Sequence, residues 1–116
     1  MNITEAENAF RQIQAALEDE KQAKAAAKTA RDQAKAMVNQ ASEGLKSAIE
    51  DPMQVTGSET EALVKLGRIE VAWQTFQDAN EGAKELKAAA KDALKEARRK
   101  LEESIKETTQ LGFAGF

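Results

Sequence analysis

The 116-residue sequence contains no cysteine, no histidine and no tyrosine. Without cysteine, the chain can form neither a disulfide bond nor a thiolate metal site. The lack of histidine removes the commonest general base and a common ligand of transition metals. Because carboxylates and lysines alone would have to carry any chemistry, we expect a protein that is not an enzyme and that binds no metal and no cofactor.

Long hydrophobic runs are also missing, since no apolar stretch approaches the ~20 residues that a helix needs to span a bilayer. Residues 1–6 lack the basic and apolar regions of a signal peptide. We therefore expect a cytoplasmic protein without a membrane partner, or a virion component if a phage encodes it.

Aromatic residues are scarce at 4%, whereas hydrophobic residues reach 41% and charged residues 32%. Much of the hydrophobic fraction is therefore alanine. A chain rich in Ala, Glu, Lys and Gln with a heptad repeat is typical of long helices and coiled coils. At this length we expect one domain at most.

A heptad pattern runs from Ser58 to Thr109. Its steps of three and four residues predict a coiled-coil seam whose phase never slips. One series of predicted seam positions is Leu66, Trp73, Asn80, Lys87, Leu94, Leu101 and Thr108, and the other is Ala62, Ile69, Phe76, Ala83, Ala90, Ala97 and Ser104.

A second heptad pattern precedes it, with bulky residues at its ends and mostly alanine between them. Asn2 with Glu5, or Thr4 with Glu7, forms a capping box at its start. Glu20 interrupts the predicted seam, and Phe10, Leu17, Val38 and Leu45 widen it. The seam positions are Ala6, Ala9, Ile13, Ala16, Ala23, Ala27, Ala30, Ala34, Met37, Ala41 and Ala48.

Pro52 and Gly57 separate the two patterns, and Ser58 with Glu61 forms a new capping box. We predict an all-α fold, a long antiparallel helical hairpin (coiled coil) assembled into a bundle oligomer. The expected boundaries are helix 3–49, turn 50–57, helix 58–109 and a C-terminal tail 110–116. A domain-swapped dimer would satisfy the same pattern, and a break at 78–82 would make three helices.

Folding about a centre near residue 54 places each position i opposite residue 108 minus i. Small residues then face large ones, with Ala34 near Trp73 and Ala97 near Ile13. The same register brings Glu20 close to Lys87, which would align the two helices.

One alanine-faced helix covers only part of a tryptophan, so we expect a homo-oligomer centred on Trp73. Val38, Leu45 and Leu63 lie beside the seam and would be left partly in water. The expected oligomer interface consists of Leu66, Ile69, Trp73, Phe76 and Leu86.

The last seven residues, 110–116, depart from the helical pattern and contain two glycines and two phenylalanines. Gln110, Leu111, Phe113 and Phe116 resemble the sliding-clamp-binding peptide of bacterial and phage replication proteins. In that peptide a glutamine and a leucine precede apolar anchors that end in an aromatic residue. The resemblance implies docking on a protein partner, and the alternative is that these side chains pack on the bundle itself.

Cations flank the predicted seam on both helices and form what we call the basic edge. Such an edge could follow the phosphate backbone of a nucleic acid, or it could be a solvated face that keeps the hairpin soluble. The basic edge consists of Lys24, Lys28, Arg31, Lys35, Lys84, Lys91, Lys95 and Arg98.

Together these features predict a non-enzymatic helical scaffold or accessory protein. It would act by coiled-coil self-assembly and by docking of its tail on a protein partner. Capsid or virion assembly and accessory roles in replication or transcription all fit such a chain. The alternative function is nucleic-acid binding through the basic edge.

Overall fold

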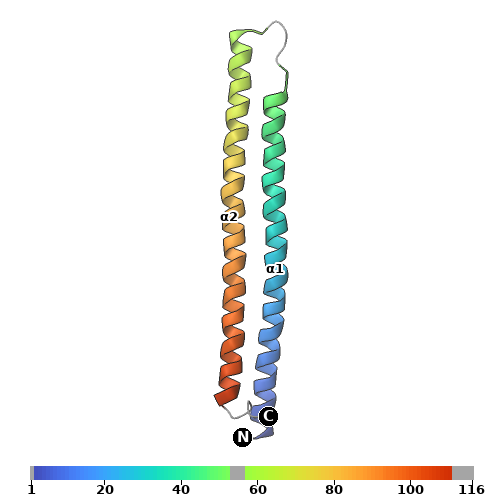
Figure 1. Cartoon of the computed structure of the whole chain (residues 1–116), viewed down its shortest axis with the longest axis vertical. Coiled ribbons are helices and arrows are strands. Elements are labelled where there is room, and N and C mark those ends of the chain that lie inside the picture. The colour runs from blue at the N-terminus through green and yellow to red at the C-terminus, as the bar shows by residue number, and fades with distance from the viewer. Residues whose placement is uncertain (1, 53–56, 111–116) are drawn as a thin grey trace. The chain divides into compact units, whose positions relative to one another are not determined.

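The computed structural model describes residues 2–52 and 57–110. These residues form two helices, α1 (Ile3–Glu50) and α2 (Glu59–Gln110), and they contain no strand (Figure 1). The predicted all-α class is therefore confirmed. The helix bounds differ by a residue from the expected 3–49 and 58–109.

Side-chain caps explain where both helices begin. The Glu5 amide donates a hydrogen bond of 2.8 Å to Asn2 Oδ1, so Asn2 rather than Thr4 caps α1. At the start of α2 the capping box is reciprocal. The Glu61 amide donates to Ser58 Oγ at 3.2 Å, and the Ser58 amide donates to Glu61 Oε2 at 3.4 Å.

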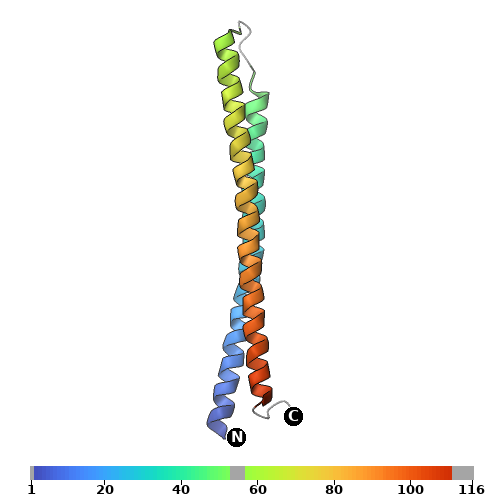
Figure 2. The ribbon, with the colours of Figure 1, turned by 90° about the vertical axis from the view of Figure 1, so that its left-hand side faces the viewer.

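Helix α2 continues without interruption through 78–82, where the sequence allowed for a break between two helices. Figure 2 shows both helices unbroken after a quarter turn of the view. The three-helix alternative is therefore wrong. The unchanged helical pattern on either side of this stretch outweighs the cost of one interior glycine, about 1 kcal/mol.

The chain divides into two compact units. Unit 1 combines Met1–Ala30 with Ala88–Phe116, and unit 2 is Arg31–Lys87. In unit 1, Gln12 and Asp19 of α1 line one groove with Glu107 and Lys100 of α2. Residue numbers rise along one helix as they fall along the other, so the helices are antiparallel.

Unit 2 is a helical hairpin. Directly after α1, Asp51 and Pro52 line a groove with Thr60, Glu61 and Val64 of α2. Lys65 Nζ also donates a hydrogen bond to the Asp51 carbonyl oxygen. Proline disfavours helical conformation in the residue before it, which explains the end of α1 at Glu50.

The predicted register is wrong in both units. It places Met37 opposite residue 71, whereas Met37 Cε lies 3.3 Å from the point that a Cβ on Gly82 would occupy. It places Gln12 opposite residue 96, whereas Gln12 shares a groove with Glu107. The shift is about three helical turns.

The buried stripe of α1 follows the predicted alanines. Ala34 is only 2% exposed, and Ala9, Ala16 and Ala30 are also buried. Ala6, Ile13, Ala23, Ala27, Ala41 and Ala48 are half-buried. One predicted position differs, because Met37 is exposed and Val38 takes its place.

In α2 the predicted seam holds fully in unit 1 and only partly in unit 2. The positions Ala90, Leu94, Ala97, Leu101, Ser104 and Thr108 are all half-buried. In unit 2, Ile69, Phe76 and Ala83 of one predicted series are buried or half-buried. In the other series, the half-buried position is mostly the residue before the predicted one. Ala72 and Leu86 are half-buried in place of Trp73 and Lys87, and Lys65 in place of Leu66. The prediction of a seam without a slip is therefore wrong.

Candidate interaction surfaces

Trp73 is the bulkiest side chain of the expected oligomer interface, and it lies at the border of its helix pair. It is 49% exposed, and its ring centroid is 5.9 Å from that of Phe76. Leu66 is 51% exposed, whereas Ile69, Phe76 and Leu86 are half-buried. The five expected residues therefore divide into an accessible pair and three that also pack within unit 2.

Three large apolar side chains line the same side of unit 2, which we call the unit 2 apolar edge. They are Ile49 of α1 and Leu66 and Trp73 of α2, all about half exposed. Each directly follows a half-buried residue, Ala48, Lys65 or Ala72. In heptad terms they are e positions, and the e positions of two antiparallel helices border the same side of the seam.

Unit 1 has its own apolar edge, which we define as Phe10, Leu17 and Ile105. Phe10 is 64% exposed, and the other two are about half exposed. The sequence pattern places Phe10 and Leu17 in a widened seam and gives Ile105 no role. Their spacing of seven residues in α1, one position after Ala9 and Ala16, is the signal that could have placed them at e positions.

All eight residues of the basic edge are exposed. Five of them, Lys24, Lys28, Lys91, Lys95 and Arg98, belong to unit 1. The other three, Arg31, Lys35 and Lys84, belong to unit 2. Each unit therefore carries its own set of cations.

The expected pairing of Glu20 with Lys87 is wrong. Glu20 instead forms an ion pair of 3.0 Å with Lys24, one turn along its own helix. The neighbouring Asp19 lies in the groove with Lys100, so this part of α1 is opposite a later part of α2. Lys87 is itself exposed, while Asn80 is half-buried.

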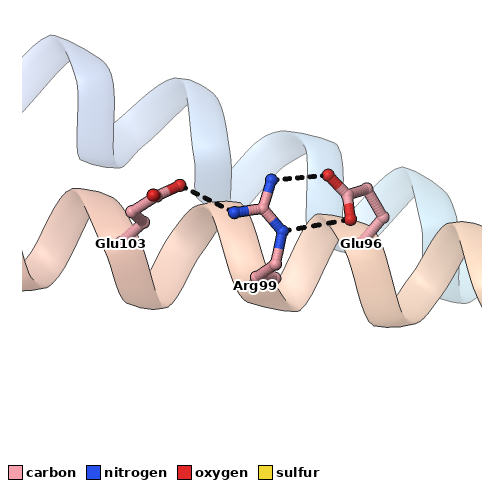
Figure 3. A network of polar contacts seen from close by, with 3 residues as sticks. All are labelled: Glu96, Arg99 and Glu103. Atoms are coloured by element: carbon pink, nitrogen blue, oxygen red, sulfur yellow. Dashed lines mark hydrogen bonds and ion pairs between the residues drawn. The ribbon is translucent and has the colours of Figure 1, made fainter.

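Arg99 forms the most connected polar cluster among the described side chains (Figure 3). It donates to Glu96 through Nε at 3.1 Å and through Nη2 at 2.6 Å, and it donates to Glu103 through Nη1 at 3.0 Å. These hydrogen bonds lower the pKa of Glu96 and raise the pKa of Arg99. All three residues lie on the solvent side of α2, so the cluster adds little to stability.

The C-terminal tail is described only at its first residue. Gln110 is the last residue of α2. Leu111, Phe113 and Phe116 lie outside the described residues, so the resemblance to a clamp-binding peptide stays a prediction.

Within residues 2–52 and 57–110, no group of acidic side chains is placed to hold a metal ion. Neither described helix is long and apolar enough to cross a membrane. No protein family model, curated protein or solved structure matches the chain. Its function is therefore inferred from its own surfaces.

Proposed function

We propose that this chain is a non-enzymatic helical scaffold or accessory protein that self-associates by coiled-coil packing and docks on a protein partner through its tail. One observation supports the self-association most directly. Every buried residue among the described ones is an alanine, while Trp73, Leu66, Phe10 and Leu17 are about half exposed or more. The bulky apolar surface is thus largely left for another molecule.

An area estimate shows the size of the effect. A tryptophan side chain has on the order of 200 Å² to bury. Since Trp73 is 49% exposed, covering the rest would remove roughly 100 Å² from water. At about 25 cal/mol per Å² this contributes about 2.5 kcal/mol for each chain. Leu66 and Ile49 on the same edge would add to it, as in the core of a four-helix bundle.

The first experiment measures the mass of the full chain by sedimentation velocity and light scattering. We expect a homo-oligomer, and we expect Trp73→Ala combined with Leu66→Glu to reduce it to a monomer that stays largely helical by circular dichroism. Leu86 is not suited to this test, because it also packs within unit 2.

The control is Val71→Ala combined with Val64→Glu, which makes the same kind of change two residues before each test position. Both valines are exposed and lie off the apolar edge. This variant should keep the mass of the unmodified chain. A monomeric unmodified chain well above micromolar concentration would contradict the proposal.

Tail docking rests on the likeness of Gln110, Leu111, Phe113 and Phe116 to clamp-binding peptides. The test is fluorescence anisotropy of the full chain with a purified bacterial sliding clamp. Leu111→Ala, Phe113→Ala and Phe116→Ala together should abolish binding, because a few anchor side chains carry most of the binding energy of an interface. The same triple variant should leave the oligomer mass unchanged. No binding by the unmodified chain would exclude the clamp as the partner.

A further inference from the structure

Unit 1 carries six exposed cations on one side, which we call the unit 1 cation cluster. They occupy e and b heptad positions, with steps of three and four residues along each helix. The groove shared by Asp19 and Lys100 fixes the local register, so the two groups of three lie at the same level of the helix pair. The cluster consists of Lys21, Lys24 and Lys28 of α1 and Lys91, Lys95 and Arg98 of α2.

The carboxylates near the cluster offset only part of its charge. Glu20 pairs with Lys24, which belongs to the cluster, whereas the Glu96 carboxylate is bound by Arg99, which does not. Asp92 and Glu102 lie beside Lys95 and Arg98 on the outer face of α2. Six cations against Glu20, Asp92 and Glu102 leave a local surplus of positive charge on a chain with a net charge of -3.

We infer that the unit 1 cation cluster binds the phosphate backbone of double-stranded DNA without reading its sequence. Each row of three cations spans seven residues of helix, which is about 10 Å. A duplex presents phosphates densely enough to meet both rows, with one charge per ~1.7 Å of its axis. No aromatic side chain lies within either row, and single-strand binding without sequence preference depends on such stacking.

Binding of this kind has a characteristic salt dependence. Each neutralised phosphate contributes about −0.9 to the slope of log affinity against log salt. Six contacts set an upper limit of about −5, so affinity should fall by up to about a thousandfold between roughly 50 mM and 200 mM salt. The cluster lies on the same side of unit 1 as its apolar edge, since both occupy e positions. The DNA test is nevertheless distinct from the self-association test, because Trp73 and Leu66 belong to unit 2.

The experiment titrates the full chain into a labelled duplex of about 20 base pairs, long enough to extend past both rows. Fluorescence anisotropy is measured over a range of salt concentrations. The test variant is Lys91→Gln, Lys95→Gln and Arg98→Gln, and the control is Arg11→Gln, Lys100→Gln and Lys106→Gln. Both variants remove three positive charges from exposed positions of unit 1 and keep good helix formers.

For the test variant, we expect the slope of log affinity against log salt to become less steep by about three. The control should keep the slope and the affinity of the unmodified chain. Equal losses in both variants would show that only net charge matters and would overturn the assignment of the site. No binding at low salt, tighter binding to a single strand of the same length, or binding only to anionic phospholipid vesicles would overturn the choice of ligand.

Discussion

The two units differ in which side chains of α2 pack between the helices and which lie at the edge. In unit 1 the half-buried positions are those that a strict heptad predicts, such as Leu94 and Leu101. In unit 2 one series moves by a residue, so that the small Ala72 lies inside and Trp73 lies at the edge. A single heptad repeat in the sequence therefore corresponds to two different seams.

Helical geometry accounts for the change. A straight α-helix drifts by about 20° per heptad relative to a 3.5-residue repeat. Over the 52 residues of α2 this drift adds up to more than a third of a turn unless the helix supercoils or the seam slips. Two successive steps of four residues, 86 to 90 to 94, mark the slip in α2, and 30 to 34 to 38 mark one in α1.

The largest effect should come from a charge in the seam. Ala34→Glu in unit 2 should cost about 3 kcal/mol or more, because Ala34 is 2% exposed and a buried unpaired charge is strongly unfavourable. Ala16→Glu in unit 1 should cost clearly less, since Ala16 shares its groove with Lys100. Urea unfolding followed by circular dichroism measures both. Equal losses would mean that the two seams are equally closed.

The departure of unit 2 from the predicted seam can be tested with two of its alanines. A strict heptad places Ala62 inside and Ala72 outside, whereas in the structure Ala62 is exposed and Ala72 is half-buried. Ala72→Glu should therefore lower the free energy of unfolding by about 1 to 3 kcal/mol. Ala62→Glu should change it by less than about 0.5 kcal/mol. Urea unfolding measures both variants. A larger loss for Ala62→Glu than for Ala72→Glu would support the strict heptad instead.

The smallest effect concerns how closely the helices approach in unit 2. Gly44→Ala should stabilise by up to about 1 kcal/mol, because an added Cβ meets no atom within 4 Å and alanine favours helix. Gly82→Ala should gain less, since its Cβ would contact Met37 Cε at 3.3 Å. Thermal unfolding of the two variants compares them. An equal gain would mean that Met37 moves aside without cost.

The sequence predicted the helices well and the surfaces less well. Capping residues and heptad spacing act within a few residues, so Ser58, a start of α1 at Asn2 or Thr4 and the alanine stripe of α1 could be read directly. The apolar edges were harder, because an e position differs from a seam position by one residue. Whether Trp73 is core or edge depends on where a slip occurs, and one chain's pattern does not mark that place.

By itself, then, the sequence determined an all-α chain, the starts of both helices and the stripe of α1 that is buried. Only the tertiary structure decided that Met37 lies beside Gly82 and that Trp73 and Leu66 border the seam. The physical reason is that a slide of about three turns returns each helix to nearly the same face. Periodicity is almost unchanged by such a slide, so the register depends on how side-chain bulk and the connection after Glu50 fit together in space.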